Sequence, residues 1–154
     1  GDLTPAQLYI SEVSGPANEV PADAPDFSLD PAYGAVELQA GFMPDPHTVS
    51  ITAGGAYNAY QIPGCVGFIA TAPDYRVTYS AGQYPLTFRV ESEADTTLVI
   101  NDAQGNWVCN DDTNGLNPEV RFDAPASGQY DVWVGTFTEG TLSPSTLSVT
   151  ERSN

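Results

Sequence analysis

Short segments in which apolar and polar residues alternate run through most of the sequence, and this pattern limits the fold more than any other feature. The segments are AVELQ, TVSIT, DYRVTY, PLTFRV, TTLVIN, NWVC, EVRF, QYDVWVGT and TLSVT. Breakers such as AGG, SAGQYP, DAQG, DDTNG, APASG and TEG separate them. Short alternating strands at this spacing are typical of an antiparallel sandwich or barrel. No window keeps the apolar period of a helix, so we predict an all-β domain.

One pairing can be predicted directly. The loop DAQGN between TTLVIN and NWVC is typical of a hairpin, which would place these two strands side by side. Trp107 then lies in the core or at the rim of the sheet. We interpret Trp107 and Trp133 as packing residues rather than as ligand-binding residues.

The first thirty or so residues have a different character. The stretch SGPANEVPADAPDFSLDPAYG is rich in proline and acidic residues and has few apolar anchors, so it does not fold alone. We predict an extended arm over residues 1–32 and a β-sandwich over residues 33–154. The arm is a linker, a disordered segment or an extended strand that docks on another surface. In the last case its isolated apolar residues would pair with an open sheet edge, its own or a neighbour's. They are Leu8, Tyr9, Ile10, Val13, Val20, Phe27 and Leu29.

The charge balance excludes several classes of partner. The chain has 20 acidic residues, four arginines and no lysine, and its formal net charge is −16. Nucleic acid and anionic lipid both need a basic surface, so neither is an expected partner. No apolar run of about 18 residues is present, so no membrane span is expected. Divalent cations would relieve the repulsion among the carboxylates.

Cys65 and Cys109 are the only cysteines. In an acidic chain rich in glycine and proline we predict that they form one disulfide; two buried free thiols are the alternative. The chain opens with GDLTPAQLYI, with neither a methionine nor a charged and apolar leader, which is consistent with a mature exported protein; a chain trimmed at this point is the alternative. Together these features predict a secreted protein, extracellular or periplasmic.

Four stretches in order resemble the bacterial pre-peptidase C-terminal domain group. They are DTTL at 95–98, CNDD at 109–112, NP at 117–118 and GQYDVWVG at 128–135. The resemblance extends from about residue 63 to the end of the chain. It implies an antiparallel jelly-roll-like β-sandwich, export, a non-catalytic role and, in some members, bound calcium. Members are usually attached to a catalytic domain, and none is visible in this sequence.

The stretch CNDDTNGLNP, at 109–118, is the candidate metal site. Calcium takes six to eight oxygen ligands from carboxylates, amides, carbonyls and water, and two adjacent aspartates repel each other unless a cation or hydrogen bonds hold them. A plain solvated turn is the alternative, because Asp, Asn and Gly are ordinary turn residues. We predict a Ca²⁺ site with ligands from this turn and from nearby strand ends. The candidate ligands are Asp111, Asp112, Asn114, Asn117, Asp95 and Asp102.

Nothing in the sequence indicates an enzyme. His47 is the only histidine, and the chain has no Gly-x-Ser-x-Gly, HExxH or phosphate-loop motif. We therefore expect a secreted, non-catalytic, calcium-stabilised β-sandwich that binds extracellular partners or self-assembles. In the second case the arm would act as a donor strand of a homo-oligomeric surface or filament subunit. The alternative is a polymer- or protein-binding accessory module of a secreted hydrolase.

Overall fold

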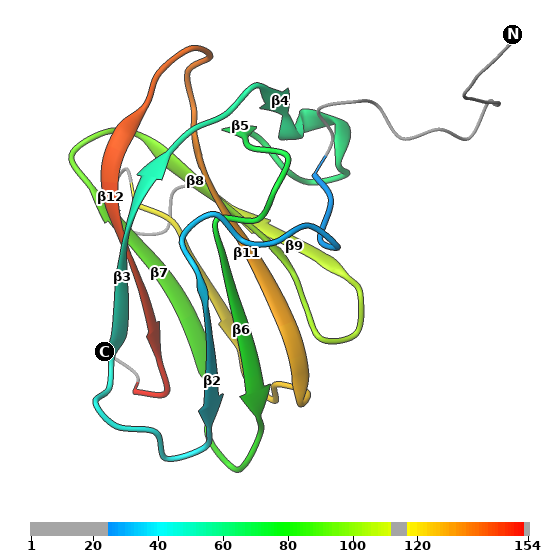
Figure 1. Ribbon diagram of the computed structural model, residues 1–154, viewed down its shortest axis with the longest axis vertical. Helices are drawn as coiled ribbons and strands as arrows, with labels where there is room; N and C mark the ends of the chain where they lie inside the picture. Colours follow the sequence, from blue (N-terminus) through cyan, green and yellow to red (C-terminus); the bar gives the residue numbers. More distant parts are fainter. Residues whose placement is uncertain (1–24, 112–116, 153–154) are drawn as a thin grey trace, which may run out of the picture.

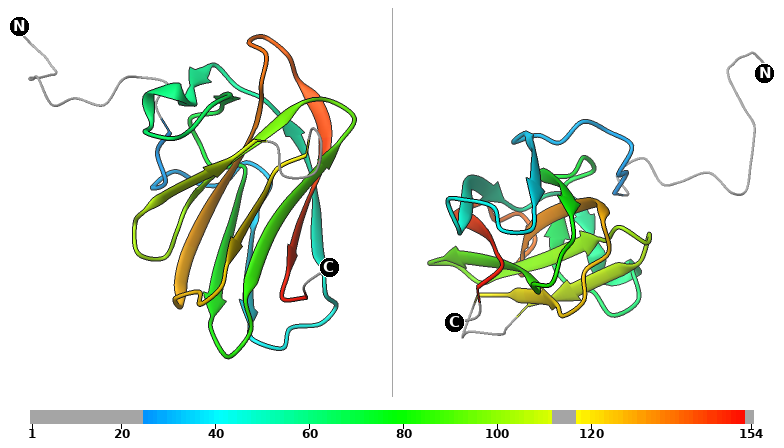
Figure 2. Two further views of the ribbon diagram at one scale, coloured as in Figure 1. Left: turned by 180° about the vertical axis from the view of Figure 1, so that it is seen from behind. Right: turned by 90° about the horizontal axis from the view of Figure 1, so that it is seen from below.

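Two β-sheets packed face to face form the molecule, and the computed structural model describes residues 25–111 and 117–152 of it (Figure 1). The smaller sheet has four strands, all antiparallel to their neighbours. Its order is β10 (Glu119–Phe122), β7 (Leu86–Ser92), β12 (Ser143–Thr150) and β3 (His47–Ala53). Figure 2 shows the two layers from behind and from below.

The larger sheet has seven strands around β11 (Gly128–Thr136). One side of β11 pairs with β6 and then, at Thr136, with β5, while the other side pairs with β8. Each of these three partners pairs with one further strand: β2 pairs with β6, β4 with β5 and β9 with β8. The bounds are β2 (Ala35–Gln39), β4 (Tyr57–Asn58), β5 (Phe68–Ile69), β6 (Tyr75–Ser80), β8 (Thr96–Asn101) and β9 (Trp107–Asn110).

The predicted all-β sandwich is confirmed, and so is the hairpin of β8 and β9, whose register pairs Asn101 with Trp107. One pair departs from the antiparallel pattern, because β2 runs parallel to β6. Alternation of apolar residues shows which face of a strand is buried but does not show its direction. A helix long and apolar enough to cross a membrane is not found in the described part of the chain.

The main core lies between the sheets and is built from the inward-facing residues that alternate along each strand. Phe88 of β7 contacts both Phe122 and Tyr130, with ring centroids 6.0 and 5.7 Å apart. The fully buried aliphatic residues of this core include Val77, Val90, Leu98, Ile100, Val132, Val134, Leu147 and Val149.

A second cluster covers the outer face of the larger sheet. The segment with β4, a short 3-10 helix (Ala59–Gln61) and β5 lies over Trp133, which is fully buried and 5.3 Å from Trp107 between ring centroids. The Cys65–Cys109 disulfide joins this segment to β9, so the predicted bridge is confirmed. Both tryptophans are packing residues, as expected. Strand β8 is consequently buried on both faces.

Residues 25–34, most of which the sequence analysis assigned to the arm, are bound to the sandwich. The Asp26 amide donates to the Thr71 carbonyl over 2.8 Å. Arg76 donates from Nη2 to the carbonyls of Phe27 and Leu29 over 2.7 and 2.9 Å. The rest of the predicted arm, residues 1–24, lies outside the described residues.

Candidate functional site

Strand β3 forms one edge of the smaller sheet, with β12 on one side only. The Thr52 amide donates to the Tyr33 hydroxyl over 3.3 Å, so it points away from β12. Backbone groups of an antiparallel strand alternate between its two sides, and therefore the amides of Thr48 and Ser50 also point away from β12. None of the described strands pairs with this outer edge.

The described residues cover the side of the sandwich beside this edge only in part. Strands β2 and β3 follow one another and belong to different sheets, and Phe42 in the loop between them is buried in the main core. Three apolar side chains nearby are only partly buried against that core: Val36, Leu38 and Val49. The outer edge of β3 therefore offers unpaired backbone groups next to partly exposed apolar side chains. An added strand would pair with the first and cover the second.

Two carboxylates fix the loop between β2 and β3 to the end of β12. Glu151 accepts hydrogen bonds from the Gly41 amide over 2.8 Å and from the Tyr79 hydroxyl over 2.5 Å. Burial, together with the Glu151 carboxylate, raises the pKa of the Tyr79 hydroxyl. Asp45 accepts from the Glu151 amide over 3.0 Å and from the Thr150 hydroxyl. The loop is therefore held in place, and β3 starts from a fixed position.

His47 takes part in packing at the start of β3. Its Nε2 lies 2.8 Å from the Tyr75 hydroxyl of the other sheet, and the two rings are stacked. Burial lowers the pKa of the imidazole, and burial also raises the pKa of the Tyr75 phenol. The contact joins the two sheets.

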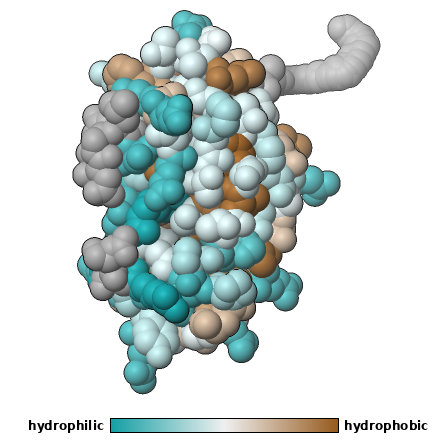
Figure 3. All heavy atoms as spheres, turned by 90° about the vertical axis from the view of Figure 1, so that its left-hand side faces the viewer, coloured by the Kyte–Doolittle hydropathy of each residue, from teal (hydrophilic) through white to brown (hydrophobic). Residues whose placement is uncertain are grey.

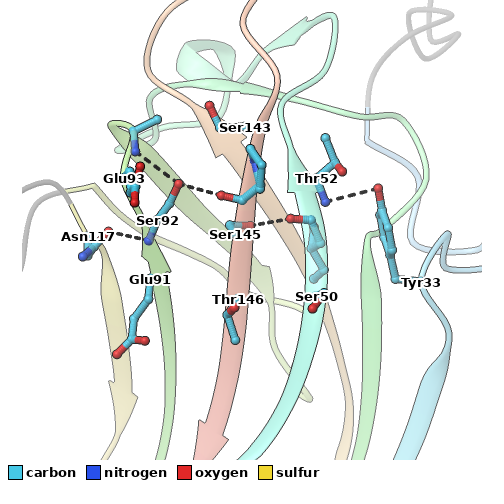
Figure 4. Close-up of a pocket in the computed structure, with 13 residues that line it drawn as sticks. Tyr33, Ser50, Thr52, Glu91, Ser92, Glu93, Asn117, Ser143, Ser145 and Thr146 are labelled. Atoms are coloured by element: carbon cyan, nitrogen blue, oxygen red, sulfur yellow. Dashed lines mark hydrogen bonds between the residues drawn. The ribbon is translucent and has the colours of Figure 1, made fainter.

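A groove of about 1110 Å³ crosses β3, β12 and the end of β7 next to the free edge (Figure 4). Hydroxyl groups make up most of its polar lining, joined by two carboxylates, one amide and one phenol. The lining residues are Tyr33, Ser50, Ile51, Thr52, Glu91, Ser92, Glu93, Ala94, Asn117, Ser143, Pro144, Ser145 and Thr146. This surface was not predictable from the sequence, because Ser and Thr on the solvent side of a strand give no local signal of binding.

Several of these polar groups are used within the fold. Ser92 donates from its hydroxyl to the Pro144 carbonyl over 2.8 Å, and its amide donates to the Asn117 side-chain oxygen over 3.1 Å. The Ser145 hydroxyl donates to the Ile51 carbonyl over 2.7 Å. These bonds fix the floor of the groove and leave the exposed Ser50, Glu91 and Glu93 facing solvent (Figure 4).

Among the described residues that line the groove there is no arginine, lysine or histidine. Three of the four arginines of the chain form ion pairs elsewhere, Arg76 with Asp131 over 2.6 Å, Arg89 with Glu119 over 3.2 Å and Arg121 with Asp123 over 2.7 Å. The side of the molecule that carries β3 and β12 is mainly hydrophilic, and its apolar residues lie in separate patches (Figure 3). This surface repels anions and accepts neutral or cationic groups.

The candidate calcium ligands do not all lie together. Asp102 accepts from the amides of Gln104 and Asn106, each over 2.9 Å, and so organises the turn between β8 and β9. Asp95 precedes the other end of β8, and a strand of six residues separates the two by roughly 20 Å. Asp102 therefore cannot share an ion with Asp95.

Asp95, Asp111 and Asn117 belong to the same end of the sandwich. Leu98 pairs with Asn110, so Asp111 follows on β9 towards the start of β8, and Asn117 is bonded to the end of β7. Asp112 and Asn114 lie outside the described residues. Among the residues with described positions, no group of three or more His, Cys, Asp or Glu side chains is placed to hold one metal ion.

Two solved structures are similar to this chain over most of its length. The pre-peptidase C-terminal domain of a collagenase from Bacillus anthracis matches 79% of this chain and 98% of its own, at 18% identity and a TM-score of 0.43. PliG of Aeromonas hydrophila, a periplasmic inhibitor of g-type lysozyme, matches 76% of this chain and 96% of its own, at 14% identity and a TM-score of 0.40. No family model and no curated protein matches the sequence. The group that the sequence resembles is thus also found among its structural neighbours.

Proposed function

We propose that this protein is a non-catalytic module that works outside the cytosol and self-assembles by strand addition. In this proposal residues 1–24 of one copy pair with the outer edge of β3 in the next copy. The observation that supports it best is the unpaired edge at Thr48 and Ser50 beside the partly buried Val36 and Val49. Main-chain hydrogen bonds would supply affinity, and alternate apolar side chains would set the register.

The composition of β3 supports the proposal. Soluble proteins usually protect a long edge strand with lysine, proline, a bulge or a covering loop. β3 is seven residues long, and its outward side chains are the exposed Thr48, Ser50 and Thr52. Within residues 25–111 and 117–152, the one outward amide of β3 with a hydrogen-bond partner is that of Thr52, which Tyr33 covers. This composition supports the addition of another strand at the edge. The disulfide supports a site of action in an oxidising compartment.

A proline placed at Ser50 tests the proposal. The Ser50 amide points away from β12, so Ser50→Pro removes a donor from the free edge and leaves the β12 pairing intact. We expect Ser50→Pro to be monomeric, and Ser50→Ala, which keeps the amide, to assemble like the unaltered chain. Light scattering after size-exclusion chromatography gives the molar mass of each variant.

A variant lacking residues 1–24 is expected to be monomeric as well, because it has no donor segment. Its circular dichroism spectrum should remain that of a folded β-protein. If the shortened chain and Ser50→Pro both assemble like the unaltered protein, strand addition at β3 is wrong.

We also propose that the stretch CNDDTNGLNP (109–118), the acidic turn, binds a calcium ion that stabilises the fold. Its composition supports this proposal, and so does the position of Asp111 and Asp95 at one end of the sandwich. Free calcium at about 100 times its Kd would stabilise the fold by roughly 2.7 kcal/mol. For a chain of this size a chelator should then lower the Tm by roughly 5–10 °C. Differential scanning calorimetry with calcium and with EDTA measures the change.

Asp102 provides a matched control for the calcium experiment. We expect Asp111→Asn to reduce the effect of EDTA on the Tm. Asp102→Asn, at the far end of β8, should leave that effect unchanged. An identical Tm with and without EDTA in the unaltered protein would exclude a structural calcium ion.

The groove favours the second candidate function, a polymer- or protein-binding accessory module of a secreted hydrolase. The groove is concave, and hydrogen bonds such as that of Ser145 to Ile51 hold its floor in place, so its shape is suited to binding a ligand.

A further inference from the structure

Three polar side chains form a row across the groove. Thr146 of β12 is directly opposite Ser50 of β3 on one side and Glu91 of β7 on the other. Neighbouring strands are about 4.8 Å apart, so the row places a hydroxyl, a hydroxyl and a carboxylate over roughly 10 Å. Ser50 and Glu91 are exposed, and Thr146 is partly exposed. This spacing suits a ligand that carries several hydroxyl groups along its length.

An aromatic ring stands at one end of the row. Tyr33 is 39% exposed, and its hydroxyl is held by the Thr52 amide. Because this bond limits the movement of the ring, the exposed part of the ring is available at a low cost in entropy. A sugar ring offers the complementary surface, apolar C–H groups on its faces and hydroxyls around its rim.

The charges of the lining narrow the class of ligand. The carboxylates of Glu91 and Glu93 are acceptors that a ligand's hydroxyl groups can bond, and a charged acceptor makes a stronger bond than a neutral one. The described part of the lining offers no cationic side chain to bind a carboxylate, sulfate or phosphate. The hydroxyls of Ser50 and Thr146 are uncharged, so they bond a neutral ligand as well as a cationic one.

We infer that the groove over β3, β12 and β7 binds an uncharged glycan chain. Glu91, Thr146 and Ser50 bond its hydroxyl groups, and Tyr33 packs against a sugar face. The inference is independent of self-assembly, because glycan binding is measured as affinity and assembly as molar mass, so either can fail alone.

Isothermal titration calorimetry of the full chain tests the inference. The probes are soluble neutral oligosaccharides of glucose, mannose, xylose and N-acetylglucosamine, with polygalacturonate as an anionic polymer and polylysine as a cationic peptide. We expect at least one neutral oligosaccharide to bind and polygalacturonate not to bind. Hydrogen-exchange mass spectrometry should show protection in the segments containing Tyr33, Glu91 and Thr146 on binding.

Two variants with the same change of charge distinguish glycan binding in the groove from an effect of net charge. Glu91→Gln is expected to weaken glycan binding about tenfold. Glu37→Gln, on the exposed face of β2 in the other sheet, should bind like the unaltered protein. The inference is overturned by the absence of binding to every neutral oligosaccharide, by equal affinities of the two variants, or by protection of the groove by polylysine alone.

Discussion

Replacing both Cys65 and Cys109 by alanine is expected to lower the free energy of unfolding by roughly 4 kcal/mol. The bridge links residues 44 positions apart, and without it the unfolded chain gains the conformational entropy of that loop. The folded state is affected too, because the bridge holds the segment that covers Trp133 against β9. For a protein of this size the Tm should fall by roughly 8–16 °C.

Chemical denaturation followed by tryptophan fluorescence and by circular dichroism measures this effect. Trp107 and Trp133 both belong to the second cluster, so fluorescence reports on that cluster and circular dichroism on the sheets. The oxidised protein and the protein kept reduced are the natural controls, since the reduced form should behave like the double alanine variant. A loss below about 1 kcal/mol would show that the cluster is stable without its bridge.

Replacing Asp74 by asparagine is expected to remove a large part of the pH dependence of stability. Asp74 is 3% exposed, and its Oδ2 accepts a hydrogen bond from the Val134 amide over 2.7 Å. Burial raises the pKa of this carboxyl from 3.8 to about 7 in the folded protein, although the bond from Val134 opposes the shift. Between about pH 4 and pH 7 the folded state therefore binds a proton that the unfolded state has lost, so stability falls as the pH rises.

A shift of this size corresponds to a loss of about 4 kcal/mol across that interval. The Asp74→Asn side chain keeps an oxygen for the Val134 amide and does not ionise. We expect equal stabilities at pH 4 and a more stable variant at pH 8. Urea unfolding at both values measures the difference, with Glu37→Gln as a control for the loss of one exposed charge. Parallel pH profiles of Asp74→Asn and the unaltered chain would contradict the assignment.

The strands were predictable because each carries its own local pattern. Tyr75, Val77 and Tyr79 alternate with polar residues in β6, and Leu147 and Val149 do the same in β12. The direction of β2 was not predictable, since a strand five residues long with Val36 and Leu38 inward reads the same in parallel and antiparallel pairs.

The second cluster and the groove both depend on residues that are distant in sequence. Trp133 is buried on the outer face of its sheet because the segment containing Cys65 folds over it. Ser50, Thr146 and Glu91 become neighbours only when β3, β12 and β7 pair in this register. Asp102 shows the opposite case, in which a residue close in sequence to the acidic turn lies at the far end of a strand.

An electron cryo-microscopy map of the assembled protein tests strand addition most directly. We predict a continuous strand of density beside Thr48 and Ser50 of β3, within hydrogen-bonding distance, that traces to residues 1–24 of a neighbouring copy. A map in which the subunits meet through other surfaces, with the outer edge of β3 in contact with solvent, would contradict the proposal.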